Sequence, residues 1–148
     1  MERYPKFKER GEKGLENLEK LRKSLTEMCR QLKENIDSGK YDALVSDDTG
    51  GRLPTLVLRE VFKKVNSQKD LKTLFVATGM TYKPKNEEEE KLLADYLKKG
   101  LGDSKNVLLV TQYIHTGKTL GRLANELKKI GVSEIDATSV YGNVDERD

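Results

Sequence analysis

Residues suited to binding a phosphate group follow a short apolar run in the last third of the chain. Residues 107–110 read Val-Leu-Leu-Val, which is typical of a buried strand, and a helical pattern begins near Thr119. Thr116, Gly117 and Lys118 lie between the two. The start of a helix presents backbone N–H groups and a partial positive charge, and both favour an anion. The hydroxyls of Thr116 and Thr119 and the Lys118 ammonium add to this preference, so the stretch predicts a phosphate-binding loop.

A second loop of the same kind lies near residue 50. Residues 43–47 predict a strand, and a helical apolar pattern begins at Leu53. The residues from the end of that strand to the helix are Asp47, Asp48, Thr49, Gly50, Gly51 and Arg52. Glycines allow backbone amides to approach an anion closely. Arg52 is either a phosphate-neutralising group or an ordinary residue at the start of a surface helix.

Two roles are open for the acidic pair Asp47 and Asp48. Their carboxylates are hard oxygen ligands of the kind that Mg²⁺ prefers, and a Mg²⁺ ion there would bridge phosphate groups. The same side chains are also suited to capping the helix that begins near Leu53. The sequence supports both interpretations.

The phosphate loop is not a P-loop, because Gln112 stands at the position five before Gly117 where that motif has glycine. Residues 107–120 instead resemble, without a gap, the PRPP-binding motif of type I phosphoribosyltransferases, where PRPP is phosphoribosyl pyrophosphate. That motif has four apolar residues, two acidic residues, two mostly apolar residues and a Thr-Gly-x-Thr loop. The segment from His115 to Thr119 is closest to the hypoxanthine-guanine branch, which often carries Asp-Thr-Gly-Lys-Thr. The departure is Thr111 and Gln112, which occupy the two acidic positions.

The resemblance implies a role for each part of the two loops. It implies that Thr116, Gly117, Lys118 and Thr119 bind the 5′-phosphate and that Thr111 and Gln112 face the ribose hydroxyls. It also implies that Thr49, Gly50, Gly51 and Arg52 bind the pyrophosphate, with Mg²⁺ as the cofactor whenever PRPP is bound. The expected ligand is therefore a small phosphorylated ribose or a nucleotide.

His115 is the only histidine of the chain and a candidate catalytic residue. It stands where the hypoxanthine-guanine branch carries an Asp thought to handle the proton of the base. A histidine can perform acid–base chemistry near neutral pH. The alternative is a loop histidine that contacts only phosphate or solvent.

The elements that position these residues alternate between strand and helix. Strands are predicted at residues 43–47, 71–78, 107–111 and 134–140, with helical patterns after the first three. This order predicts an α/β fold of three layers, with a mostly parallel sheet between helices, like that of the phosphoribosyltransferases. Ligands of such sheets bind beyond the carboxyl ends of the strands, and both glycine loops follow strand ends. The two loops are therefore expected to converge.

The first 40 residues form a helical extension of the predicted core at residues 41–148, within a single domain of 148 residues. Apolar residues spaced by three and four, including Leu15, Leu18, Leu25 and Leu32, predict an amphipathic helix over residues 12–37. We favour an apolar stripe that covers the core. The alternative is that it forms a dimerisation seam, so a homodimer is retained as a prediction.

Composition indicates a globular protein without a membrane span. The net charge of +3 is small and mixed, which argues against nucleic acid as a partner. The single Cys29 excludes an intrachain disulfide and fits a reducing compartment. No apolar run approaches the length of a membrane helix, so a cytoplasmic protein is expected.

The sequence is compatible with three functions. The first is a phosphoribosyltransferase that couples an acceptor to the ribose of PRPP. The second is a non-catalytic protein of the same fold that senses a nucleotide or serves assembly, because neutral Thr111 and Gln112 bind ribose hydroxyls more weakly than carboxylates do. The third is an RNA-binding module that uses the basic N-terminal segment. The sequence alone does not decide whether the protein is an enzyme.

Overall fold

The computed structural model describes residues 3–47, 50–67, 69–77, 86–112 and 118–141, except for the side chains of residues 3–11, 118 and 119. The strands in these ranges are β1 (Ala43–Asp47), β2 (Lys72–Val76), β3 (Asn106–Thr111) and β4 (Glu134–Ser139). They form one parallel sheet in the order β2-β1-β3-β4. The predicted α/β architecture is confirmed, and the sheet of the described strands is parallel throughout.

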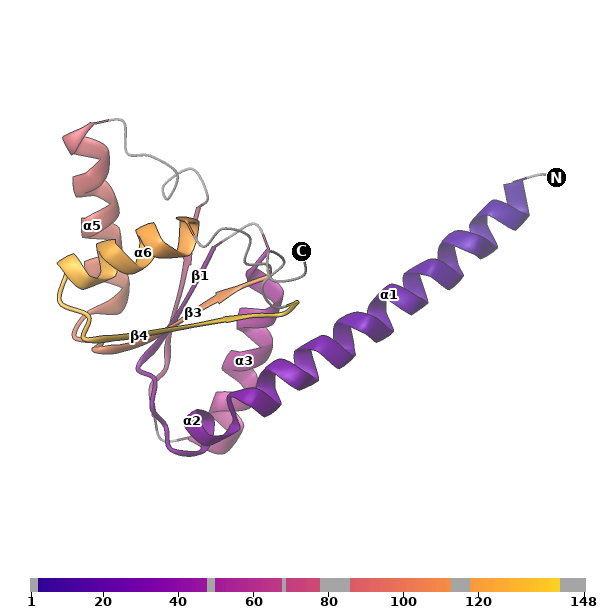
Figure 1. Ribbon diagram of the computed structural model, residues 1–148, viewed down its shortest axis with the longest axis horizontal. Helices are drawn as coiled ribbons and strands as arrows, with labels where there is room; N and C mark the ends of the chain where they lie inside the picture. Colours follow the sequence, from indigo (N-terminus) through magenta and orange to yellow (C-terminus); the bar gives the residue numbers. More distant parts are fainter. Residues whose placement is uncertain (1–2, 48–49, 68, 78–85, 113–117, 142–148) are drawn as a thin grey trace.

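Helices cover both faces of this sheet (Figure 1). One face packs against α3 (Arg52–Val65), α2 (Lys33–Asp37) and the end of α1 (Arg3–Gln31), and the other packs against α5 (Glu87–Leu101) and α6 (Lys118–Lys129). The alternation of side chains along β3 sets this division. Leu109 belongs to the apolar cluster under α5 and α6, whereas Leu108 belongs to the cluster under α3. Because both faces are covered, β3 is apolar at successive positions.

The start of α5 illustrates how local sequence fixes a helix boundary. Asn86 is the N-cap, and its side-chain oxygen accepts a hydrogen bond from the backbone N–H of Glu89 at 2.9 Å. The acidic residues 87–90 occupy the first turn, where the helix dipole stabilises them. Gly102 follows the last turn with φ of 56°, a backbone conformation that glycine adopts readily. The acidic run thus marks a solvated helix start.

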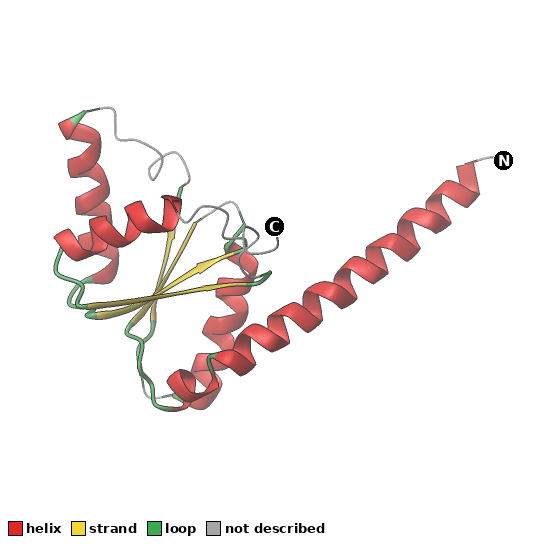
Figure 2. Cartoon of the chain, in the orientation of Figure 1, coloured by secondary structure: helices red, strands yellow, loops and turns green. Residues whose placement is uncertain are grey.

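The N-terminal helix is longer than the sequence indicates, and most of its length projects from the α/β body (Figure 2). It begins at Arg3, whereas the apolar pattern predicted a start near residue 12. Pro5 is compatible with this start because the first turn of a helix does not use its backbone N–H groups. The helix ends at Gln31, and a bend at Leu32 separates it from α2.

Only the last part of the predicted apolar stripe packs against the sheet. Met28 is 2% exposed and Leu32 and Ile36 are also buried, in one cluster with Leu44 of β1. Leu15, by contrast, is 68% exposed. The expectation that the stripe covers the core is therefore confirmed for the end of α1 and for α2, and is wrong for the first half of the stripe.

A polar cluster joins the end of this N-terminal segment to the edge strand β4. The hydroxyl of Tyr41 donates a hydrogen bond to Oδ2 of Asp136 at 2.6 Å, and Nζ of Lys40 donates to the same oxygen at 2.8 Å. Burial and the neighbouring Asp136 carboxylate raise the pKa of Tyr41. Lys40 and Tyr41 in turn lower the pKa of Asp136. The cluster fixes the first and last parts of the chain against each other.

None of the helices in the described parts of the chain combines the length and apolar character that a bilayer span requires.

Candidate functional site

The two predicted loops begin at neighbouring strands in the middle of the sheet. β1 and β3 lie side by side, and the helices that follow them, α3 and α6, pack on opposite faces (Figure 1). The chain therefore departs in two directions from the carboxyl ends of adjacent strands. This is a topological switch point, the place where open parallel sheets bind ligands.

Gly51 is packed against the ends of both central strands. A Cβ atom at Gly51 would lie 2.1 Å from Oγ of Ser46 and 2.6 Å from the backbone oxygen of Val110, so a larger residue does not fit. Its own carbonyl accepts hydrogen bonds from the backbone N–H and the hydroxyl of Thr55, at 3.0 and 2.6 Å. The main chain of the glycine loop thus lies directly over the junction of β1 and β3.

Gln112, the residue after β3, contacts the glycine loop that follows β1. A Cβ atom at Gly50 would lie 2.7 Å from Oε1 and 2.8 Å from Cβ of Gln112, so the glutamine side chain lies across the main chain of Gly50. The backbone oxygen of Gln112 accepts a hydrogen bond from the N–H of Tyr141 at 3.2 Å. The residue predicted to face the ribose is therefore in contact with the loop predicted to face the pyrophosphate.

Thr111, the other predicted ribose-side residue, is buried. It is 4% exposed, and its backbone oxygen accepts a hydrogen bond from the N–H of Val140 at 3.2 Å. In the described structure Gln112 is more accessible than Thr111, because it is only partly buried. Of the two neutral replacements for the acidic pair, Gln112 is thus better placed to meet a ligand.

Arg52 is oriented by an aromatic residue of the neighbouring strand. Its guanidinium carbon lies 4.6 Å from the centroid of the Phe75 ring, a cation–π geometry. Phe75 itself is fixed by the pairing of β2 with β1 and by Tyr96 of α5, whose hydroxyl donates to the backbone oxygen of Phe75 at 2.5 Å. Arg52 begins α3, so its charge lies beside the glycine loop.

Asp47 is the last residue of β1 and lies directly before the glycine loop. Its Oδ1 is a buried atom and would lie 2.7 Å from a Cβ atom at Gly51, so one carboxylate oxygen faces the glycine loop. No group of three or more His, Cys, Asp or Glu side chains suited to a metal ion occurs among the described residues. The N-cap of α3 is Gly51.

Several predicted residues lie outside the described part of the chain. These are Asp48, Thr49, His115, Thr116 and Gly117. Lys118 and Thr119 form the first turn of α6 as described backbone. The helix start expected near Thr119 is therefore confirmed to within one residue, and the 5′-phosphate contacts themselves stay predictions.

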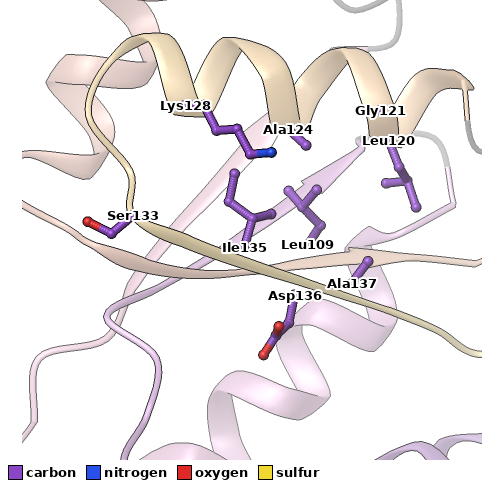
Figure 3. Close-up of a pocket in the computed structure, with 9 residues that line it drawn as sticks. All are labelled: Leu109, Leu120, Gly121, Ala124, Lys128, Ser133, Ile135, Asp136 and Ala137. Carbon is purple, nitrogen blue, oxygen red and sulfur yellow. The ribbon is translucent and has the colours of Figure 1, made fainter.

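A separate cavity of about 440 Å³ lies between α6 and the edge strand β4 (Figure 3). Small residues of α6, Gly121 and Ala124, face Ile135 and Ala137 of β4 and leave this space, with Lys128 near its rim. None of the predicted site residues whose side chains the structure describes lines it. The cavity is therefore distinct from the switch point.

Sequence reasoning did not single out Ser46, Phe75 or Tyr96. Ser46 is fully buried against Gly51, and its position directly before Asp47 carried no motif. Phe75 was visible only as one apolar residue of a predicted strand. Its contact with Arg52 joins residues of two different strand–helix units, and such a contact leaves no periodic signal in the sequence.

Comparison with known proteins assigns no family to the chain. No protein-family profile and no curated protein matches it. Among solved structures, the chain is similar to the purine phosphoribosyltransferase from Pyrococcus horikoshii Ot3, with 17% sequence identity and a TM-score of 0.49 over 84% of this chain and 80% of that chain.

Proposed function

We propose that the edge of the sheet beyond β1 and β3 binds a phosphorylated ribose, either PRPP or a nucleotide that contains ribose 5-phosphate. The observation that carries the proposal is the contact between Gln112 and Gly50, because it brings the end of β3, from which the predicted phosphate loop departs, against the glycine loop that follows β1. Two helices also begin at this edge, and their N-termini favour anions. A ligand with a phosphate at each end of a ribose matches two anion-favouring loops.

Each loop has an assigned role in this proposal. The loop from Thr116 to Thr119 holds the 5′-phosphate, and the loop from Thr49 to Arg52 holds the pyrophosphate or a second anionic group. Arg52 supplies the positive charge, and its guanidinium stacks on the Phe75 ring. Gln112 and Thr111 supply neutral hydrogen-bonding groups on the ribose side.

Transfer from PRPP would break the bond between C1 of the ribose and pyrophosphate and form a bond to an acceptor nucleophile. Catalysis would depend on positioning and on neutralising the leaving group. His115 would exchange a proton with the acceptor. A Mg²⁺ ion, when bound, would neutralise the pyrophosphate, with Asp47 and Asp48 as its protein ligands.

A second candidate is binding without turnover. Two features favour it. Thr111 and Gln112 are neutral, so neither gives the ribose a carboxylate partner, and Thr111 is also buried, which limits its contact with a ligand. Hydrogen bonds to a charged group are about twice as strong as those between neutral groups. A protein with this site would bind a nucleotide or a sugar phosphate and report its presence.

Isothermal titration calorimetry with three ligands tests the proposal. PRPP with and without Mg²⁺, ribose 5-phosphate and a nucleoside monophosphate are titrated into the protein, and pyrophosphate release is assayed in parallel. We expect binding of at least one ligand, weakened in Lys118→Ala and unchanged in the matched control Lys128→Ala at the other end of α6. Pyrophosphate release with an acceptor base identifies a transferase, and binding without release identifies a sensor. If none of the three ligands binds, the proposal is wrong.

A further inference from the structure

The first half of α1 carries an apolar face that nothing in the described structure covers. Leu15 and Leu18 are 68% and 62% exposed, while Met28, on the same stripe of the same helix, is 2% exposed. Leu21 and Leu25 lie between these extremes and are partly buried against the core. The stripe thus runs from the core of the domain onto an exposed surface. The helix that carries it projects from the α/β body (Figure 1).

Two glycines continue the stripe toward the start of the helix, and the described structure gives no packing reason for one of them, Gly14. Gly14 lies seven residues before Leu21, and Gly11 lies seven residues before Leu18, so both continue the heptad pattern of the stripe. A Cβ atom at Gly14 would meet no atom within 4 Å, so packing within the chain does not require glycine there. Glycine weakens the interior of a helix. Its use on an apolar face is explained by the close approach of a second helix.

We propose that the projecting half of α1 pairs with the same segment of a second copy of this chain, antiparallel, to form a homodimer. In an antiparallel pair with its two-fold axis near residue 16, Leu18 lies opposite the partner's Gly14, and Leu21 lies opposite the partner's Gly11. Each leucine then fills the space that a glycine leaves. In a parallel pair the glycines would face each other, which leaves a gap at each glycine layer that no side chain fills.

Charge and size also favour a second copy over a strongly charged partner. Residues 12–24 carry three acidic and four basic side chains, so neither a nucleic acid nor an acidic peptide finds a complementary surface there. Glu19 and Arg22 already form an ion pair at 2.7 Å along this segment. The two-fold axis lies 12 residues before Met28, about 18 Å along the helix, so the two α/β bodies stand at opposite ends of the pair.

Sedimentation velocity across a range of protein concentrations tests the interface. The wild type is expected to be a dimer in the micromolar range. The double variant Leu15→Glu with Leu18→Glu should raise the dimer dissociation constant at least 100-fold without unfolding the chain, because both side chains are exposed in the protomer. Its control is Lys13→Gln with Lys20→Gln, which changes the net charge equally on the opposite side of the helix. A monomeric wild type, or a double variant that remains dimeric, overturns the proposal.

The glycine contact has its own test. Gly14→Leu should leave the protomer folded, because its site is open, and should keep or raise the helical circular-dichroism signal. It should nevertheless weaken the dimer at least tenfold, because the leucine opposite loses its space. A dimer that is equally tight or tighter in this variant overturns the assigned packing.

Disulfide trapping tests the orientation, in a background in which the single Cys29 is replaced by serine. Leu15→Cys should cross-link across the two-fold axis under mild oxidation. Leu21→Cys should not, because an antiparallel pair separates the two copies of residue 21 by about 15 Å along the axis, beyond the reach of a disulfide. Cross-linking of Leu21→Cys with none of Leu15→Cys overturns the antiparallel arrangement.

Discussion

The amide of Gln112 lies against the main chain of Gly50, with Oε1 placed 2.7 Å from where a Cβ atom at Gly50 would be. The contact links residues that are 62 positions apart and belong to different strand–helix units. It also places a neutral amide where the PRPP motif that the chain resembles carries an acidic residue. The charge at position 112 is therefore a direct way to change the ligand preference of the proposed site.

Gln112→Asp is expected to strengthen binding of PRPP in the presence of Mg²⁺ by about five- to tenfold, because a hydrogen bond to a charged group exceeds a neutral one by about 1 kcal/mol. Calorimetry with Gln112→Ala as the control measures the effect. The single change is preferable to a double change with Thr111→Asp, because Thr111 is 4% exposed and a buried carboxylate would destabilise the fold. Unchanged affinity, together with tight binding and turnover by the wild type, would show that the neutral pair is no defect.

Gly51→Ala is expected to lower the free energy of unfolding by about 1–3 kcal/mol, since the new methyl group would overlap the backbone of Val110 and the hydroxyl of Ser46. Gly121→Ala in α6 is the matched control. A Cβ atom there meets nothing within 4 Å, so this change should be neutral or should stabilise by up to about 1 kcal/mol. Urea denaturation measures both. Equal effects of the two substitutions would contradict the close packing of the loop.

Thr119→Val is expected to weaken binding of ribose 5-phosphate by about 1–2 kcal/mol, the value of one lost hydrogen bond to a charged group. Valine retains the branched shape, so the first turn of α6 should persist. The comparison is made by calorimetry, with Thr26→Val in α1 as a control for a threonine far from the loop. A variant that binds the ligand as tightly as the wild type removes Thr119 from the proposed phosphate site.

In Asp136→Asn, the free energy of unfolding is expected to fall less between pH 7 and pH 2 than it does in the wild type. The pKa of Asp136 is lowered by Lys40 and Tyr41, so its contribution is present above the ordinary pKa of an aspartate, about 4. That contribution is lost as the pH falls through the lower, folded-state pKa. The side chain is 40% exposed, so the effect should stay below about 1 kcal/mol. Unfolding followed from pH 7 to pH 2, with the exposed Asp95→Asn as control, tests this.

Met28→Ala is expected to lower the free energy of unfolding by about 2–4 kcal/mol, because Met28 is 2% exposed within the cluster beneath α3. Leu92→Ala, at a residue of α5 that is 64% exposed, should change it by less than about 0.5 kcal/mol. Thermal denaturation distinguishes the two. A negligible effect of Met28→Ala would mean that the N-terminal helix is an accessory to the fold.

Periodic apolar residues were sufficient to predict the order of the core elements. Strand β1 matches residues 43–47, and β3 differs by one residue from the predicted 107–111, because buried parallel strands are apolar at successive positions. The start of α1 was predicted too late. Residues 3–11 are polar, but Pro5 fits a first turn, and Gly11 and Gly14 do not interrupt the helix. Apolar periodicity detects the face of a helix that packs and does not detect its unpacked end.

The candidate site was predictable only as two loops at strand ends. That Gln112 reaches Gly50, and that Arg52 stacks on Phe75, depends on the order of strands in the sheet, and a single sequence does not specify which strand neighbours which. The burial of Thr111 has the same origin. Its partner in the motif, Gln112, follows it directly, yet the two side chains differ in exposure because successive residues at a strand end face different sides.

The placement of β1 between β2 and β3 has a consequence for how the chain folds. The side chain of Asp42 accepts hydrogen bonds from the backbone N–H groups of Lys105 and Asn106, residues 63 and 64 positions later. The central pair of strands therefore forms only after the chain has closed a long loop, an entropic cost that slows folding. On a ribosome, β1 has one neighbour, β2, until synthesis has passed β3. Through that interval its other edge is open to strands of other chains, so synthesis is the stage at which this protein is most exposed to aggregation.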